Sequence, residues 1–230
     1  MEKRFMELLA PLGIHPDART LQRFRTYFTD LAAKNEVMNL TAIEGEEDVY
    51  LRHFYDSLCL VKAGPVAGLS LLDVGAGAGF PSLPLRIVFP DLQVTIVDST
   101  GKRIDFLRNL LAKLEIEGVE TLHLRVEEFD RREAFDLVTA RAVARMNVLA
   151  ELCLPFVRVG GRFVAMKTDG CEAELAEAKD AIAILGGTVE RIVRYEVGSE
   201  RVHALVVVRK TANTPARYPR AYGQIKKKPL

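Results

Sequence analysis

The stretch Leu71-Leu72-Asp73-Val74-Gly75-Ala76-Gly77-Ala78-Gly79-Phe80 decides the fold of this chain. It predicts a buried strand that stops at an acidic residue, followed by a loop with glycine at every second position. Glycine has no Cβ and tolerates φ > 0, so such a backbone can approach a ligand closely. A second apolar strand, residues 92–97, ends on Asp98. Nucleotide-binding folds use an acidic residue about 20 positions past the loop to hold ribose hydroxyls, so we expect a nucleotide-like ligand.

The glycine spacing excludes two common phosphate loops. A dinucleotide fingerprint, G-x-G-x-x-G, would require glycine where Phe80 or Ser82 stands, and no Gly-Lys-Ser or Gly-Lys-Thr of a P-loop follows. The remaining pattern, D-x-G-x-G-x-G, resembles the loop of S-adenosylmethionine-dependent methyltransferases, which wraps the aminoacid part of that cofactor. The alternative is a tight glycine turn without a ligand. We expect S-adenosylmethionine binding by Asp73, Gly75, Gly77, Gly79 and Asp98.

Composition is ordinary for a globular protein, with 230 residues, 49% apolar and 27% charged. No apolar run approaches the ~20 residues of a membrane helix, and the N-terminus lacks a signal-peptide pattern. Three cysteines and four histidines show no metal-ligand spacing. We therefore expect a cytoplasmic enzyme with no membrane association and no metal site.

Alternating apolar strands and helical patterns predict an α/β, Rossmann-like fold with a mostly parallel sheet. We expect strands near 69–74, 92–98, 119–125, 135–141 and 161–167, and helices near 81–89, 101–115, 145–157 and 171–185. Two β-rich runs, 188–197 and 201–209, flank Gly198-Ser199-Glu200 and predict an antiparallel C-terminal hairpin. The predicted parts are an N-terminal helical extension packed on the core (1–60), the Rossmann-like domain (61–210) and a C-terminal tail (211–230).

The tail is basic. Residues 209–230 contain seven Lys or Arg and no Asp or Glu, whereas the first 208 residues contain 25 basic and 31 acidic residues. Tyrosines interleave with the arginines at Arg217, Tyr218, Arg220 and Tyr222. Cations with aromatic rings are typical of contacts to phosphates and unpaired bases. A solubilising tail is the alternative.

Further candidates lie at the ends of the predicted strands, where open α/β sheets bind ligands. Val126 and Glu127 follow the third strand and are placed to meet the adenine of the cofactor. Arg141 ends the fourth strand and is placed to hold the cofactor carboxylate or the substrate. The alternatives are a solvated charge at Glu127 and a strand-end ion pair at Arg141. Earlier in the chain, Arg52 and Asp56 are four apart and are predicted to pair across one helical turn.

From Asn39 to the last residue, the chain resembles the bacterial small-subunit methyltransferase G family of 16S ribosomal RNA methyltransferases, also called glucose-inhibited division protein B. The matching segments are Asn39-Leu40-Thr41, Arg52-His53 with Asp56-Ser57, Asp73 to Pro81 with Pro84, Asp98-Ser99 with Lys102-Arg103, Arg125-Val126-Glu127, Arg141-Ala142-Val143-Ala144, and the tail motifs around Thr214-Pro215, Tyr218-Pro219-Arg220, Gly223 and Lys228-Pro229-Leu230. The resemblance implies methyl transfer to N7 of a guanosine in small-subunit ribosomal RNA. It also implies cofactor contacts at Gly75, Phe80, Val126, Glu127 and Arg141.

The sequence lacks the motifs of two other kinds of base methylation, which agrees with methylation at guanine N7. The cysteine contexts of cytosine C5 methylation and the Asn/Asp-Pro-Pro-aromatic loop of amine methylation are absent from the sequence. Guanine N7 has a free lone pair, so we expect no catalytic base. The candidate substrate-binding residues are Arg141, Lys167, Tyr218, Arg220, Lys226 and Lys228. The expected partner is 16S ribosomal RNA, free or in a small-subunit particle, bound by a monomer without a protein partner. The alternatives are a methyltransferase acting on a small molecule or protein, and a non-catalytic RNA-binding assembly factor.

Overall fold

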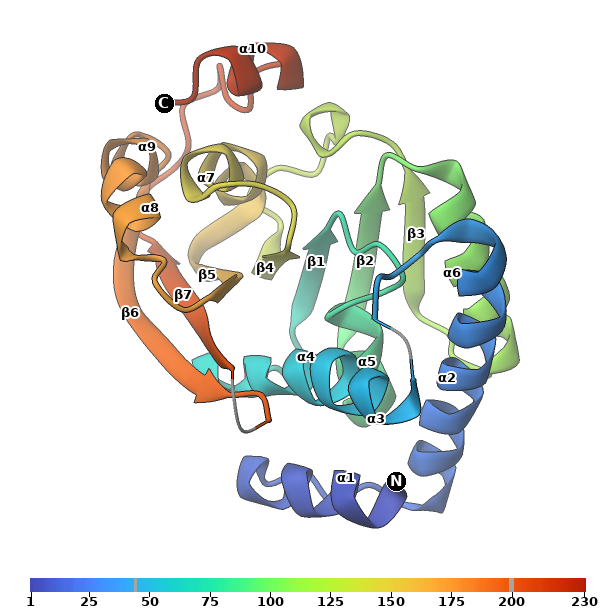
Figure 1. The fold of residues 1–230 in the computed structure, drawn as a ribbon. Coiled ribbons are helices and arrows are strands. Elements are labelled where there is room, and N and C mark those ends of the chain that lie inside the picture. Colours follow the sequence, from blue (N-terminus) through green and yellow to red (C-terminus); the bar gives the residue numbers. More distant parts are fainter. Residues whose placement is uncertain (44, 199–200) are drawn as a thin grey trace.

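The sheet has seven strands in the order β3-β2-β1-β4-β5-β7-β6, with helices on both faces (Figure 1). The computed structural model describes residues 1–43, 45–198 and 201–230. The strands are β1 Ser70–Val74, β2 Gln93–Asp98, β3 Val119–His123, β4 Phe135–Arg141, β5 Val157–Thr168, β6 Gly187–Glu196 and β7 Val202–Lys210. β7 runs antiparallel to both of its neighbours, and the other pairs are parallel. The predicted α/β fold with an antiparallel C-terminal strand is confirmed, while Ser199 and Glu200 of the predicted turn lie outside the described residues.

Consecutive apolar residues of β1 and β4 contribute to two separate cores. Leu71 pairs with Leu137 across the sheet, and both belong to the core beneath the N-terminal helices. Their successors, Leu72 and Val138, also pair and face the core beneath the C-terminal helices. Side chains alternate between the faces of a strand, so an uninterrupted apolar run is what a sheet covered on both sides requires.

The N-terminal segment and the first two crossover helices cover one face of the sheet. They comprise α1 Glu2–Leu9, α2 Ala18–Met38, α3 Glu46–Val49, a π-helix Tyr50–Tyr55, α4 Asp56–Leu58, a 3₁₀ helix Cys59–Ala63, α5 Ser82–Val88 and α6 Gly101–Lys113. Asp17 caps α2, because its carboxylate accepts a hydrogen bond of 2.7 Å from the Thr20 N–H. At the other end, Asn39 adopts φ 48° and stops the helix.

The opposite face carries α7 Met146–Cys153, α8 Glu172–Glu177, α9 Lys179–Ile184 and α10 Tyr222–Lys227. Two predicted helix bounds are wrong. The helix expected over 145–157 stops at Cys153, and a 3₁₀ turn containing Pro155 leads into β5, because proline in a helix interior removes a hydrogen-bond donor. The helix expected over 171–185 is divided into α8 and α9 at Ala178.

An aromatic cluster joins the N-terminal helices to the glycine loop. The ring of Phe54 lies 4.9 Å from Phe24 and 5.1 Å from Tyr27, measured between centroids. Tyr27 in turn stacks on Phe80, the last residue of the loop, at 5.3 Å. The Tyr27 hydroxyl also donates a hydrogen bond of 2.6 Å to the Ala78 carbonyl. These contacts fix the glycine loop against the N-terminal helices.

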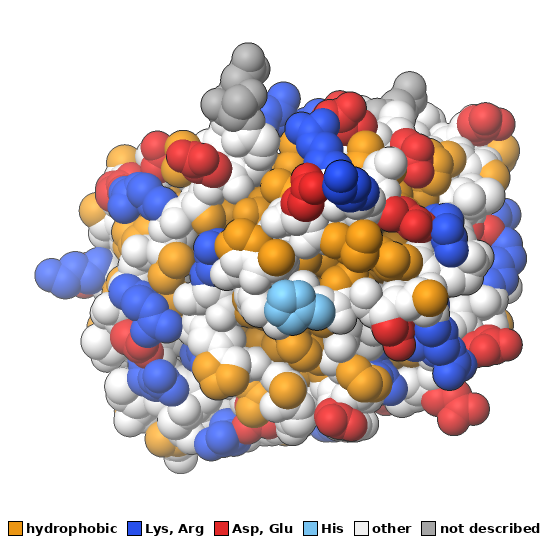
Figure 2. All heavy atoms as spheres, turned by 90° about the horizontal axis from the view of Figure 1, so that it is seen from below, with side chains coloured by type: hydrophobic (Ala, Val, Ile, Leu, Met, Phe, Trp, Pro, Cys, Tyr) orange, Lys and Arg blue, Asp and Glu red, His pale blue; other side chains and the backbone are white. Residues whose placement is uncertain are grey.

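The face seen from below Figure 1 carries hydrophobic side chains at its middle, with acidic and basic side chains interspersed around them (Figure 2). Such mixing of charges differs from the single-sign basic surface expected of a broad phosphate-binding face. Within the described ranges, no helix has the length and apolar character needed to cross a membrane.

Candidate functional site

The glycine loop follows β1 at the point where the sheet order changes direction. β1 lies between β2 and β4, so the carboxyl ends of β1 and β4 flank the crevice in which open α/β sheets bind ligands. Gly75, Gly77 and Gly79 have φ values of 70°, 61° and 104°. These angles lie in the region that other residues rarely adopt, which explains the alternating glycines.

The three glycines differ in what surrounds them. A Cβ added to Gly79 would lie 2.8 Å from both Leu83 and the Tyr27 hydroxyl, so this glycine serves packing. A Cβ at Gly75 would lie 2.9 Å from a methyl group of Val143, which follows β4. At Gly77 an added Cβ would meet no atom of the described residues within 4 Å. The open space over Gly77 is therefore where a ligand can reach the loop backbone.

Two buried aspartates flank the loop. Asp98 accepts hydrogen bonds from the N–H groups of Gly77 (3.1 Å) and Thr100 (2.8 Å), and a carboxylate has lone pairs left for ribose hydroxyls. Asp73 accepts from the Ser82 N–H at 3.1 Å, while its Oδ1 is buried without a hydrogen-bond partner in the described structure. Burial raises the pKa of Asp73 to about 7. An unsatisfied buried carboxyl oxygen and open space over Gly77 fit a ligand with hydrogen-bond donors.

The residues after β3 contact the C-terminal tail. Val126 is buried and begins a 3₁₀ turn that includes Glu127. One carboxylate oxygen of Glu127 accepts a hydrogen bond of 3.3 Å from the backbone N–H of Tyr222. The Arg125 guanidinium lies 5.5 Å from the centre of the Tyr222 ring. Glu127, which is proposed to meet adenine, is thus in contact with a segment about 95 positions later in the chain.

Arg141, at the end of β4, is held by a buried polar network. Its guanidinium donates to Asp56 Oδ2 at 2.9 Å and to His53 Nδ1 at 2.8 Å. The other oxygen of Asp56 accepts from the Tyr195 hydroxyl and from His203 Nδ1, each at 2.7 Å. Burial acts against the charge of Asp56, but the His203 bond and the Arg141 charge outweigh it, so the Asp56 pKa is lowered. The network ties the N-terminal helices to the ligand edge of the sheet.

The predicted pair of Arg52 with Asp56 is wrong. Arg52 instead pairs with Asp48 at 3.4 Å on the surface, and Asp56 is 2% exposed. The segment between them is the π-helix Tyr50–Tyr55, whose wider turn does not keep the side-chain spacing of an α-helix. Asp56 consequently points into the protein, where it meets Arg141.

His53 and Phe80 complete the base of the site. The two rings stack at 4.4 Å, and the Arg141 guanidinium lies 5.0 Å from the centre of the Phe80 ring. Burial first, and then the Arg141 charge, lower the pKa of His53 to about 3. His53 is therefore neutral, accepting at Nδ1 from Arg141 and bonded at Nε2 to the Thr41 hydroxyl at 2.8 Å. Phe80 is 4% exposed, and its ring orients His53 and Arg141 through these two contacts.

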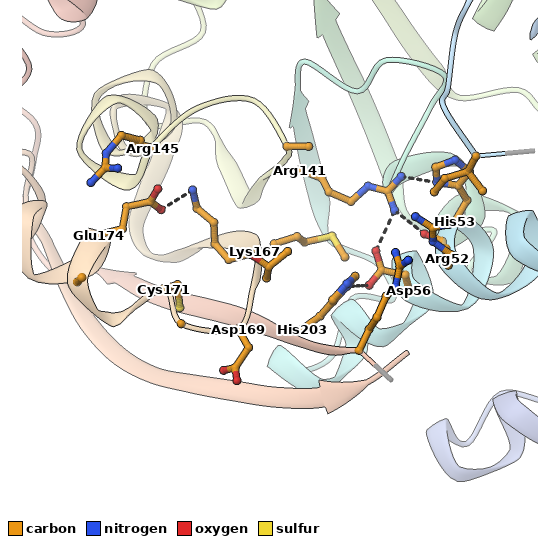
Figure 3. Close-up of a pocket in the computed structure, with 17 residues that line it drawn as sticks. Arg52, His53, Asp56, Arg141, Arg145, Lys167, Asp169, Cys171, Glu174 and His203 are labelled. Atoms are coloured by element: carbon orange, nitrogen blue, oxygen red, sulfur yellow. Dashed lines mark hydrogen bonds and ion pairs between the residues drawn. The ribbon is translucent and has the colours of Figure 1, made fainter. Parts of the chain in front are cut away.

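A cavity of about 660 Å³ opens beside Arg141 (Figure 3). Arg141, His53 and Asp56 stand on one side of it, and Lys167, Glu174 and Arg145 stand on the other (Figure 3). Among the described residues, the charged groups that line it are five basic and three acidic ones: Arg52, Arg141, Arg145, Lys167 and Arg201 against Asp56, Asp169 and Glu174. This excess of positive charge favours an anionic or electron-rich ligand.

Lys167 occupies the wall opposite Arg141. Its ammonium donates to the Ala144 carbonyl at 2.8 Å and pairs with Glu174 at 2.6 Å. The segment after β4 lies between this cavity and the glycine loop, because Ala142 lines the cavity while Val143 packs over Gly75. The structure therefore places the loop and the cavity on two sides of one short segment.

The tail residues divide into two groups. Arg220 pairs with the fully buried Glu151 of α7 at 2.6 Å, and Tyr218 is 5% exposed. Both side chains dock the tail onto the protein. Lys226 and Lys228 are exposed. The RNA contact expected of all four residues stays a prediction, and the side chains of Lys226 and Lys228 are the more accessible ones.

Sequence reasoning missed Asp56, His203 and Tyr195 as one cluster, and it missed Glu151 as the partner of the tail. Asp56 and Tyr195 are 139 positions apart, so no local pattern connects them. Glu151 did leave a signal, because it is an acidic residue within the apolar segment Leu149-Ala150-Glu151-Leu152-Cys153. A charge on the buried face of a helix requires a partner.

Two solved structures share the fold of this chain. The crystal structure of a methyltransferase from Pyrococcus furiosus is 16% identical, with a TM-score of 0.58 over 83% of this chain and 99% of that one. The TYW2 protein of M. jannaschii, solved in complex with AdoMet, is 12% identical, with a TM-score of 0.56 over 67% and 76% of the two chains. At these identities the likeness concerns the fold alone.

Sequence relatives define the family. The family described as "rRNA small subunit methyltransferase G" matches residues 20–203. A Levilactobacillus brevis protein named "Ribosomal RNA small subunit methyltransferase G" is 53% identical, covering 99% of this chain and 98% of its own length. A Staphylococcus carnosus protein of the same name is 50% identical, covering 91% and 90%. These matches confirm the resemblance carried by the sequence motifs, and the chain belongs to the rRNA small subunit methyltransferase G family.

Proposed function

We propose that this protein transfers a methyl group from S-adenosylmethionine to N7 of a guanosine in 16S ribosomal RNA. The observation that carries the proposal is the juxtaposition of the glycine loop with the basic cavity across the segment after β4. Family membership supports ribosomal RNA as the substrate. We further propose that the protein acts in the cytoplasm as a monomer, on free RNA or on a small-subunit particle.

The residues of the site would position the cofactor and the guanosine and would supply charge. When bound, S-adenosylmethionine supplies an electrophilic methyl group on its sulfonium. The loop backbone at Gly75 and Gly77, with Asp73, Asp98, Val126 and Glu127, would hold the cofactor along the carboxyl ends of β1, β2 and β3. Space over Gly77 and the unpartnered Asp73 oxygen support this placement.

Arg141 and Lys167 would orient the guanosine from opposite walls of the cavity. Guanine N7 attacks with its own lone pair, so no side chain has to remove a proton first. His53 fits this scheme because it is neutral and its Nδ1 accepts a hydrogen bond from Arg141. Alignment of N7 with the methyl group can supply ~7–11 kcal/mol of the barrier reduction. Lys226 and Lys228 would contact the phosphate backbone from the tail.

Mapping N7-methylguanosine in 16S ribosomal RNA tests this function. We expect chemical cleavage at one guanosine in RNA from cells that contain the protein and none in RNA from cells that lack it. Purified protein with S-adenosylmethionine should restore the modification in vitro. Identical cleavage patterns from both cell types would reject RNA methylation. Methylation of a small molecule or protein instead, or the absence of cofactor binding, would support one of the alternatives.

Asp98→Ala should weaken S-adenosylmethionine and S-adenosylhomocysteine together, by roughly 1.5–3 kcal/mol, as expected for hydrogen bonds to a charged group. Both ligands carry the same ribose, so a ribose contact affects them equally. Calorimetric titration measures the two affinities, and Asp105→Ala, which removes an exposed carboxylate on α6, is the control. Unchanged affinities would mean that Asp98 holds only the Gly77 and Thr100 N–H groups.

A further inference from the structure

The docked C-terminal tail contacts the residue that stands at the adenine end of the proposed cofactor site. We propose that the backbone N–H of Tyr222 positions the Glu127 carboxylate to recognise the exocyclic amino group of adenine, and that the Arg220–Glu151 pair holds the tail for this purpose. Tyr222 and Arg220 are then positioning residues that act through Glu127. The inference rests on the proposed function, because it assumes that an adenosyl ligand binds at the glycine loop.

The tail has a strong anchor. Arg220 presents its Nε and Nη2 to the two oxygens of Glu151 at 2.8 and 2.6 Å, and its backbone N–H donates to the same carboxylate at 2.8 Å. Glu151 is fully buried, and bidentate charged pairs of this geometry are both strong and directional. Ile225, on α10, is also fully buried. The backbone between Arg220 and Ile225 is therefore fixed in position.

Tyr222 lies within this fixed segment. It is the first residue of α10, and the first N–H groups of a helix have no partner inside the helix. Its N–H donates to Glu127 Oε1 at 3.3 Å. In the described part of the chain, this is the one hydrogen-bond donor recorded for the Glu127 carboxylate. One oxygen is thus held by the tail, and the carboxylate keeps further acceptor sites for a ligand.

The order of the strands indicates which part of the ligand meets Glu127. The glycine loop follows β1, Asp98 ends β2, and Glu127 follows β3, and these three strands are neighbours. A ligand with its aminoacid part at the loop and its ribose at Asp98 brings its base to Glu127. A carboxylate accepts hydrogen bonds, and the 6-amino group of adenine donates them. Hypoxanthine carries an oxygen at that position and would face Glu127 with an acceptor.

Two substitutions at position 222 isolate the N–H. Tyr222→Ala removes the ring and keeps the N–H, whereas Tyr222→Pro removes both. Proline is well tolerated at the first position of a helix, and the preceding Ala221 has the extended ψ of 139° that proline requires. A comparison of Tyr222→Pro with Tyr222→Ala therefore measures the effect of removing one backbone hydrogen-bond donor from an otherwise intact backbone. The probes are S-adenosylhomocysteine and S-inosylhomocysteine, titrated calorimetrically against the full-length protein.

We expect wild type and Tyr222→Ala to prefer S-adenosylhomocysteine over S-inosylhomocysteine by similar factors. In Tyr222→Pro we expect the adenosyl ligand to bind roughly tenfold more weakly, with little change for the inosyl ligand. Equal behaviour of the Pro and Ala variants would overturn the inference, and so would a wild type that does not distinguish the two ligands. A wild type that binds neither ligand would reject the proposed function itself.

Arg220→Ala tests the anchor, and Arg217→Ala is the matched control, since Arg217 is exposed and lies over the Tyr218 ring at 5.0 Å. Arg220→Ala should lose preference for the adenosyl ligand as Tyr222→Pro does, and Arg217→Ala should keep it. If a folded Arg220→Ala protein keeps its preference for the adenosyl ligand, the Arg220–Glu151 pair is not needed to position Glu127. Because Arg220→Ala leaves Glu151 buried without its partner and can unfold α7, the variants at position 222 decide the role of the N–H independently.

Discussion

Gly75→Val should abolish the binding of S-adenosylmethionine while the protein retains a cooperative unfolding transition. Gly75 has φ 70°, which a β-branched residue adopts only under strain, of order 1–3 kcal/mol. The new Cβ would also lie 2.9 Å from Val143, so the loop or the segment after β4 must move. That movement takes the loop backbone away from the aminoacid part of the ligand. Calorimetric titration and thermal unfolding measure the two effects separately.

Gly13→Val is the matched control for backbone strain. Gly13 has φ 71°, a Cβ there would meet nothing within 4 Å, and the residue lies outside the site. We expect a similar loss of stability in this variant with no change in cofactor affinity. Gly77→Ala refines the test, because a methyl group there enters open space and should weaken binding without a clash in the free protein. Normal affinity in Gly75→Val would rule out the assigned loop.

Asp56→Ala should destabilise the protein by about 3–5 kcal/mol at neutral pH, as expected when one member of a buried ion pair is removed. Asp56 is 2% exposed and accepts hydrogen bonds from Arg141, Tyr195 and His203. All three donors lose their partner in the variant. Denaturant unfolding measures the difference. Asp48→Ala is the control, because its pair with Arg52 is at the surface and is expected to contribute less than about 1 kcal/mol.

The loss of stability in Asp56→Ala should depend on pH in a defined way. The pKa of Asp56 is lowered in the folded protein from the usual 3.8, so its contribution is complete above that value and is lost as pH falls through the folded pKa. The difference in unfolding free energy between wild type and Asp56→Ala should therefore be constant near neutrality and shrink below about pH 4. A difference that persists undiminished in acid would mean that packing, and not the charge of Asp56, accounts for the loss. A loss similar to that of Asp48→Ala would contradict the network.

Loss of the Asp56 carboxylate should also impair the site, because among the described residues Arg141 would keep only His53 as a side-chain partner. The N-terminal helices thus contribute to the ligand edge through their charges as well as through the aromatic cluster that ends on Phe80. Both contacts reach the same short region, between the glycine loop and the end of β4. The extension therefore acts as a structural support of the site.

Local features of the sequence were sufficient for the fold and for the first part of the site. The alternation of apolar strands with helical patterns predicted a mostly parallel sheet, because parallel strands are joined by crossover helices. The glycines predicted a loop with positive φ, since that conformation is a property of the residue itself. The cap of α2 at Asp17 is a local feature of the same kind, because capping involves neighbouring residues alone.

Only the tertiary structure decided how charges that are distant in the chain combine. Asp56 meets Arg141 instead of Arg52, because burial leaves a carboxylate no water and the partner that the fold supplies comes from the end of β4. Arg220 likewise pairs with Glu151, and the tail is thereby brought onto Glu127. Hydrogen bonds and ion pairs require distances of a few ångströms, and residues separated by 69 to 139 positions in the sequence come that close only when the chain has folded.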